Sequence, residues 1–139
     1  MQTILRILKQ AGGWHHGLSL RVENLPYMAL VIEATDESGP CGLPALSVCH
    51  YGEQNSDLMR DPEMCFEVGA ATGMHLTPFY WRNDYAGVEQ WSRFIRDGQY
   101  VFHGALYRQH EQFAKQWDNN LRLQGFAEAF EQQQQTPRA

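Results

Sequence analysis

The chain has 139 residues, of which 43% are hydrophobic and 12% aromatic, and it carries a formal net charge of −5. This composition excludes a disordered chain, and the length predicts one globular domain whose core needs no disulfide or metal. Lys9 and Lys115 are the only lysines and the arginines are scattered. We therefore expect no direct binding to nucleic acid, which requires clustered positive charge.

The cysteines and the apolar runs bear on the cellular compartment. Cys41, Cys49 and Cys65 occur without a C-x-x-C pair, so neither a disulfide framework nor a zinc knuckle is predicted, and we expect reduced thiols. The N-terminal segment is too short and too charged for a signal peptide, and no apolar run approaches the ~20 residues of a membrane-spanning helix. These features predict a cytoplasmic protein without membrane association.

Helical periodicity marks both ends of the chain. Residues 3–11 place apolar side chains on one helical face, and Gly12 ends this short helix. A longer amphipathic helix is predicted over residues 105–123, with a break at Gly125 and a further apolar stripe after it.

Between the helices, alternating apolar and polar residues predict strands joined by turn residues. The predicted strands cover residues 18–22, 28–32, 45–51, 64–68, 75–82 and 88–95, with a helix as the alternative over the last of these segments. Further turns are predicted at residues 69–73 and at Asp97-Gly98. The order indicates an α+β fold: an antiparallel β-meander of about five or six strands, backed by a short N-terminal helix and a long C-terminal helix. We expect a single domain over residues 1–131 and a flexible polar tail over residues 132–139.

The stretch HYGEQNSDLMRDPEM, residues 50–64, is the most polar connection in the predicted sheet. His50 has the parity of the core-facing row of its strand. Residues 52–61 are longer than a tight hairpin connection, and Pro62, which lacks a backbone donor, is expected to start the next strand. The carboxylates expected to be exposed here are Glu53, Asp57, Asp61 and Glu63. Arg60 is expected to pair with Asp57 or Glu63.

Three interpretations of this cluster stay open: a hydrated, charge-paired hairpin, a protein-contact surface, or a divalent-metal site. In the metal interpretation, His50 with Asp57, Asp61 or Glu63 would supply ligands suited to Mn²⁺, Fe²⁺ or Zn²⁺. The sequence contains no H-E-x-x-H, EF-hand or D-x-D spacing that would favour this interpretation. We therefore predict no metal and no cofactor.

The segment YWRNDY, residues 80–85, is a second cluster of polar and aromatic side chains. Arg82 and Asp84 are expected to pair with Glu63 or Asp61 of the neighbouring hairpin. Arginine, tryptophan and tyrosine are typical of protein interfaces, although an aromatic core strand ending in a turn is the alternative. The candidate binding surface therefore comprises His50, Glu53, Asp57, Arg60, Asp61, Glu63, Arg82, Asp84 and Tyr85.

Catalytic signals are weak elsewhere in the chain. The adjacent His15 and His16 would point to opposite faces of a strand, so they are not expected to share a metal. Ser47 and Cys49 lack a G-x-S-x-G context, and Cys65 is expected to be an inert thiol. The sequence also has no glycine-rich phosphate loop, and no catalytic residue is predicted.

The runs LSVCHYGEQNSDLMRDPEMCFEV, PFYWRNDYAGVEQ and FAKQWDNNLRLQGF resemble a family of small uncharacterised domains that are encoded largely on bacterial plasmids, integrative elements and phages. The resemblance covers most of residues 18–126. It implies an accessory protein of a mobile genetic element, and it supplies no activity, cofactor or catalytic residue.

Three hypotheses about function follow. The first is a non-enzymatic protein-binding module that binds a host or element-encoded protein, for example an inhibitor or modulator of a host defence complex with an anti-CRISPR-like role. The alternative is a small metal-dependent hydrolase or nuclease that uses His50 and the neighbouring carboxylates. The third is a homodimer in which aromatic edge strands pair across a two-fold axis.

Overall fold

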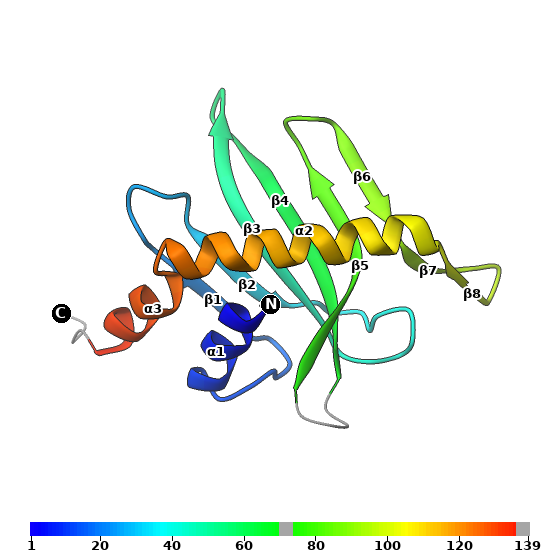
Figure 1. Ribbon diagram of the computed structural model, residues 1–139, viewed down its shortest axis with the longest axis horizontal. Helices are drawn as coiled ribbons and strands as arrows, with labels where there is room; N and C mark the ends of the chain where they lie inside the picture. Colours follow the sequence, from blue (N-terminus) through cyan, green and yellow to red (C-terminus); the bar gives the residue numbers. More distant parts are fainter. Residues whose placement is uncertain (70–73, 136–139) are drawn as a thin grey trace.

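The computed structural model describes residues 1–69 and 74–135, which form three helices and eight strands (Figure 1). The helices are α1 (Gln2–Gln10), α2 (Gly104–Leu123) and α3 (Phe126–Gln135). The strands are β1 (Ser19–Val22), β2 (Leu30–Ala34), β3 (Ala45–Gln54), β4 (Asp57–Gly69), β5 (His75–Asn83), β6 (Val88–Trp91), β7 (Arg93–Arg96) and β8 (Gln99–Phe102).

Six strands form one antiparallel sheet in the order β1-β2-β3-β4-β5-β6. Each strand therefore pairs with its neighbour in the chain, which confirms the predicted β-meander and the α+β class. The sheet is open, because β1 and β6 form its two edges. Helix α2 crosses one face of the sheet, and α1 and α3 lie near its C-terminal end (Figure 1).

The hydrophobic core lies between the helices and this face of the sheet. Alternate residues of the strands are buried there, as the period of two predicts. The buried cluster joins Leu30, Ile32, Leu46, Val48, Met64 and Phe66 to Ile4, Ile7, Leu8, Trp117, Leu121 and Phe126. Burial of one large apolar side chain stabilises a fold by about 1.5–3 kcal/mol, so this cluster holds the helices on the sheet.

The segment predicted as a long loop, residues 52–61, is instead part of a long β-hairpin. Strand β3 continues to Gln54 and β4 begins at Asp57, so Asn55 and Ser56 alone form the turn. Their φ values of 52° and 69° are those of a two-residue hairpin turn. The prediction was wrong because a hairpin that projects beyond the core has no buried face, so it lacks the alternation of apolar and polar residues that marks a core strand. Pro62 consequently lies inside β4 rather than at its start.

The predicted strand over residues 88–95 is two strands that belong to different sheets. The chain leaves the meander at Ser92, whose amide donates to the Phe79 carbonyl at 3.0 Å. The Ser92 carbonyl accepts a hydrogen bond from the His103 amide at 2.8 Å. Strand β7 pairs with β8 in a two-stranded sheet that turns at Asp97 and Gly98. The turn was predicted, whereas the small sheet was not.

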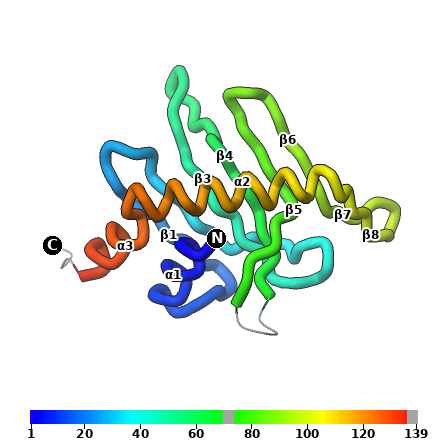
Figure 2. The backbone as a smooth tube through the Cα atoms, viewed as in Figure 1, coloured from blue at the N-terminus to red at the C-terminus, as the bar shows by residue number. Residues whose placement is uncertain are grey.

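Helix α2 contacts the N-terminal helix α1 and is followed directly by the C-terminal helix α3. Asp118 of α2 accepts hydrogen bonds from the amides of Gln2 and Thr3 at 3.1 and 2.9 Å, which places the start of α1 beside α2 (Figure 2). Gly125, with a φ of 79°, separates α2 from α3 as predicted. Helix α3 runs through Gln135 and therefore includes residues 132–135 of the segment predicted as a tail. Residues 136–139, and residues 70–73 of the predicted turn, lie outside the described residues.

Candidate protein-contact site

The two polar clusters predicted from the sequence lie next to each other at one end of the sheet. The β3–β4 hairpin and the β5–β6 hairpin project in the same direction (Figure 1). Strands β4 and β5 are paired, with Glu63 opposite Arg82. The antiparallel meander therefore brings the two segments together, as the sequence predicted.

Asp84 connects the two hairpins. Its Oδ2 accepts a hydrogen bond from the Arg60 amide at 2.8 Å, and its Oδ1 accepts one from Arg82 Nε at 2.7 Å. The Asp84 amide also donates to the Arg60 carbonyl at 2.9 Å. Arg82 and Asp84 thus pair mainly with each other rather than with Glu63 or Asp61. Burial by itself would raise the pKa of Asp84, but the hydrogen bonds from Arg60 and Arg82 outweigh it and hold this pKa below its ordinary value.

Asp61 and Glu63 were expected to be exposed, and both are half-buried. Glu63 accepts a hydrogen bond from the Ser47 hydroxyl at 2.5 Å and lies 3.7 Å from Arg60 Nε. The predicted pairing of Arg60 with Glu63 is therefore confirmed. Asp61 accepts a hydrogen bond from Asn83 Nδ2 at 2.7 Å. These carboxylates stabilise the junction of the two hairpins and offer little surface to a partner.

His50 does not lie on this surface. It is buried on the helix-facing side of the sheet, where its ring packs 5.5 Å from Trp117 and 5.4 Å from Phe126, measured between ring centroids. Its Nδ1 lies 3.3 Å from the Ala29 carbonyl oxygen. Burial lowers the pKa of His50 and favours the neutral ring. Its parity had predicted this orientation, but its place in the binding surface was wrong.

The metal alternative required His50, Asp57 and Asp61 to converge. Across residues 1–69 and 74–135, no three His, Cys, Asp or Glu side chains form a group that could hold a metal ion. Asp57 lies at the tip of the hairpin next to the turn, whereas His50 lies beneath the helices. Within the described part of the chain, His50, Asp57 and Asp61 therefore do not converge on a common site.

The exposed residues of the two clusters are found at the hairpin ends. Glu53, Asp57 and Leu58 are exposed on the β3–β4 hairpin, and the side chain of Leu58 is 72% exposed. Tyr85, from the β5–β6 turn, is also exposed. Its hydroxyl oxygen would be 2.5 Å from a Cβ atom added at Gly52, so Tyr85 packs over the bare backbone of β3. We call Glu53, Asp57, Leu58 and Tyr85 the hairpin-tip surface.

Sequence reasoning missed two buried polar groups. Glu67 of β4 is fully buried and pairs with Arg93 of β7, which is also buried. His110 of α2 is buried between the Ser92 hydroxyl, 2.8 Å from Nδ1, and the Gln90 carboxamide oxygen, 3.1 Å from Nε2. His110 falls on the apolar stripe of its predicted helix, whereas Glu67 has the parity of the face opposite Met64 and Phe66, so the strand pattern gave no signal for its burial. The partners come from distant parts of the chain, which the pattern does not reveal.

The remaining sequence candidates show no reactive arrangement. Burial raises the pKa of the Cys49 thiol to about 12 and also raises that of Cys65, so both thiols stay protonated. His15 and His16 are exposed, and the neighbouring Trp14 donates a hydrogen bond from Nε1 to the Ala45 carbonyl at 3.0 Å.

The fold and the site together define an α+β β-meander domain with projecting hairpins. A family model described as a domain of unknown function, DUF6908, matches residues 2–127, and the chain belongs to this family. The match also includes most of the first seventeen residues, which the resemblance seen in the sequence had not covered. No curated protein and no solved structure matches the chain. Among the described helices, none has the length and apolar character needed to cross a membrane.

Proposed function

We propose that this chain is a non-enzymatic protein-binding module that contacts its partner through the hairpin-tip surface. The observation that carries the proposal is the exposure of Leu58 beside the carboxylates of Glu53 and Asp57 on a projecting hairpin. A large apolar side chain that protrudes among charged residues is an anchor that a partner's pocket can bury. The acidic rim and the overall charge of −5 favour a basic partner surface.

The geometry of the junction supports this function, because the hairpins are held before binding. The hydrogen bonds of Asp84 to the Arg60 amide and to Arg82 join the β3–β4 hairpin to the β5–β6 turn. A surface that is already ordered loses less conformational entropy when it binds. Asp61, Glu63, Arg60, Arg82 and Asp84 therefore have a supporting role, and the contacts to the partner are assigned to the hairpin tips.

The proposed biological setting rests on the sequence resemblance. Similarity to domains encoded on plasmids, integrative elements and phages supports an accessory protein of a bacterial mobile genetic element. We infer that its partner is a host or element-encoded protein, and that the module inhibits or modulates a host defence complex. The acidic balance of the chain is compatible with this setting.

The test is quantitative capture of partners from a host lysate with the wild-type protein and with matched variants. Asp57→Lys and Leu58→Asp alter the hairpin-tip surface. Leu25→Asp is the control, because Leu25 is strongly exposed in the β1–β2 connection. We expect a stoichiometric protein to be lost from the two tip variants and retained by the control, with all melting temperatures within a few degrees of wild type. Retention of that protein by both tip variants would exclude the hairpin-tip surface.

A further inference from the structure

We propose that the β7–β8 hairpin is a second docking surface, and that it binds an acidic peptide segment with large apolar side chains on a partner protein. The surface, here called the aromatic hairpin patch, comprises Trp91, Phe94, Ile95, Arg96, Tyr100 and Phe102. It lies at the N-terminal end of α2, away from the hairpin tips (Figure 1). The inference does not depend on the function proposed for the hairpin-tip surface.

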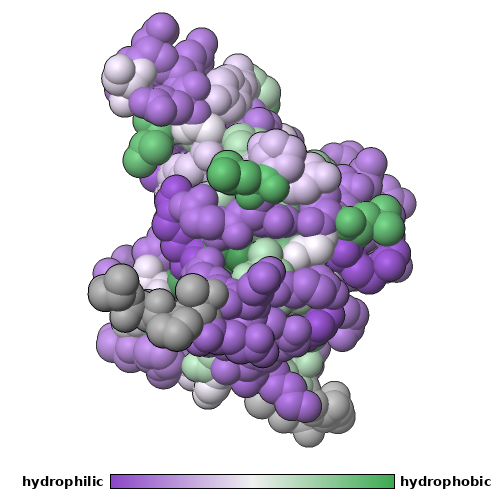
Figure 3. All heavy atoms as spheres, turned by 90° about the vertical axis from the view of Figure 1, so that its left-hand side faces the viewer, coloured by the Kyte–Doolittle hydropathy of each residue, from purple (hydrophilic) through white to green (hydrophobic). Residues whose placement is uncertain are grey.

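The patch exposes an unusual amount of apolar surface for such a short element. The exposed fractions of Trp91, Ile95, Tyr100 and Phe102 lie between 46% and 53%. Ile95 and Tyr100 are directly opposite each other in the register and share one face of the hairpin with Phe102, whereas Phe94 and Arg96 have the parity of the other face. By contrast, the end of the molecule at α3 is largely hydrophilic, and its hydrophobic side chains are scattered (Figure 3). Contiguous exposed apolar surface is characteristic of interaction sites.

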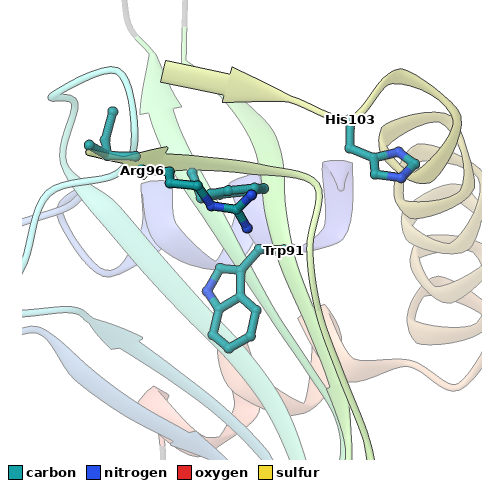
Figure 4. A pocket seen from close by; sticks show the side chains of 5 residues that line it. Trp91, Arg96 and His103 are labelled. Carbon is teal, nitrogen blue, oxygen red and sulfur yellow. The ribbon is translucent and has the colours of Figure 1, made fainter. Parts of the chain in front are cut away.

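The patch also contains a hollow that a side chain of the partner can enter. A cavity of about 490 Å³ is lined by Trp91, Phe94, Ile95, Arg96 and His103. Trp91 and Arg96 extend into it from β6 and β7, and His103 borders it at the start of α2 (Figure 4). Cavities of roughly 300–1,000 Å³ hold ligands of moderate size, so this hollow is large enough for a bulky apolar side chain.

Internal contacts hold the patch in place without covering it. Trp91 packs edge-on against Tyr80 at 5.2 Å, and Phe102 packs against Tyr107 at 5.2 Å, measured between ring centroids. Arg93, at the start of β7, is anchored by the buried carboxylate of Glu67. The hairpin is thus fixed to the sheet and to α2, and its exposed side chains are ordered before a partner arrives.

The charge around the patch selects an acidic partner. Residues 91–108 contain Arg93, Arg96 and Arg108 but only one acidic residue, Asp97, although the whole chain has a net charge of −5. Arg96 and Arg108 are exposed, and neither forms an ion pair with any residue the structure describes. Arg96 also lies over the Phe94 ring, 5.1 Å from its centroid. A carboxylate beside a bulky apolar side chain would meet both features of the patch.

A peptide fits the patch better than a nucleic acid does. Nucleic-acid binding needs a series of cationic side chains along the phosphates, whereas this patch offers two arginines, Arg96 and Arg108, that form no ion pair with any described residue. Trp91 and Phe102 each have a tyrosine packed against them, so the patch is not a ladder of free rings for stacking bases.

The test uses synthetic peptides in which tryptophan and leucine alternate with aspartate and glutamate. Controls are the same peptides with lysine in place of the acids, and an oligothymidine strand. Binding is measured by fluorescence anisotropy, and the contact is mapped by amide NMR of the isotope-labelled protein. We expect binding of the acidic peptide, shifts at the Trp91 indole and along β7 and β8, and binding of the lysine peptide weaker by about tenfold or more.

Single-residue variants then test whether the acidic peptide binds at the aromatic hairpin patch. Ile95→Asp and Arg96→Glu should each weaken binding of the acidic peptide by about tenfold. Lys115→Glu, on the exposed face of α2, and Leu58→Asp, on the hairpin tip, should leave it unchanged. The proposal is overturned if the acidic peptide does not bind, or if the lysine peptide or oligothymidine binds as tightly. Self-association that Ile95→Asp abolishes would instead make the patch an interface between copies of the chain.

Discussion

The guanidinium of Arg93 on β7 forms an ion pair with the carboxylate of Glu67 on β4, and both side chains are buried. The same carboxylate accepts hydrogen bonds from the amides of Cys41 and Leu43 at 2.9 and 3.2 Å. Arg93 also donates to the Tyr100 hydroxyl at 3.0 Å. One buried pair therefore connects a central strand, the β2–β3 connection and the β7–β8 hairpin.

Removal of one partner of this pair should be strongly destabilising. We expect Glu67→Gln to lower the free energy of unfolding by about 3–5 kcal/mol, because it leaves the buried Arg93 charge unpaired. The double variant Glu67→Gln with Arg93→Met should lose less than the sum of the two single variants, since it contains no unpaired charge. Urea denaturation of the four proteins measures this coupling. Additive losses would show that the two residues act independently.

Gly39 tests how tightly the β2–β3 connection packs on the same carboxylate. A Cβ atom at Gly39 would lie 2.1 Å from Glu67 Cγ, and the Gly39 amide is held by the Leu43 carbonyl at 2.8 Å. We expect Gly39→Ala to lower the free energy of unfolding by about 1–3 kcal/mol. The control is Gly104→Ala at the start of α2, where the new Cβ would have ordinary contacts, the nearest at 3.5 Å. That variant should gain about 0.5–1 kcal/mol, and equal effects at both positions would contradict the packing argument.

His110 should make stability depend on pH. Burial lowers the pKa of His110 to about 4, from an ordinary value of 6.5. Because the unfolded chain takes up the proton first, the stability present above about pH 6.5 is lost as the pH falls towards about 4. The variant His110→Gln should make stability depend less on pH in this range. At neutral pH it should lower the free energy of unfolding by about 1–3 kcal/mol, because Ser92 and Gln90 lose their hydrogen bonds to the His110 ring.

The measurement for His110 is urea unfolding at a series of pH values. Part of the decline should persist in the variant, because burial also lowers the pKa of His50. His15→Gln, at an exposed position, is the matched control and should retain the wild-type slope. An unchanged slope in His110→Gln would mean that this histidine is not held neutral in the folded protein.

The turn of the long hairpin should tolerate a glycine better than its native serine. Ser56 has a φ of 69°, a conformation that disfavours residues with a Cβ atom. We expect Ser56→Gly to raise the free energy of unfolding by about 0.5–1 kcal/mol, because Asn-Gly is the favoured pair in such a turn. Ser19→Gly, at the start of β1, where Ser19 pairs with Glu33, should lower it. A lower denaturation midpoint for Ser56→Gly would show that the turn is not under strain.

Local patterns determined most of the fold. The period of two placed Leu46 and Val48 on the buried face, and the helical period identified both helical ends of the chain. Local patterns failed in two segments. In residues 52–61 the largely polar run concealed two strands and their turn, and in residues 88–95 the strand pattern continued across the boundary between β6 and β7. Backbone hydrogen bonds define both boundaries. Asn55-Ser56 and Ser92 are such boundaries, and their roles depend on the strands with which the chain pairs.

The candidate site also has features that the sequence predicted and features that only the tertiary structure decided. The sequence determined that the segments around residues 50–64 and 80–85 would be neighbours, because consecutive antiparallel strands pair. Tertiary structure alone decided that Asp84 binds Arg60 and Arg82, that Glu67 meets Arg93 and that Trp91 and Ile95 stay exposed. Periodicity assigns a side chain to one face of its own element. The neighbour that covers that face comes from a distant part of the chain, and packing of the whole domain selects it.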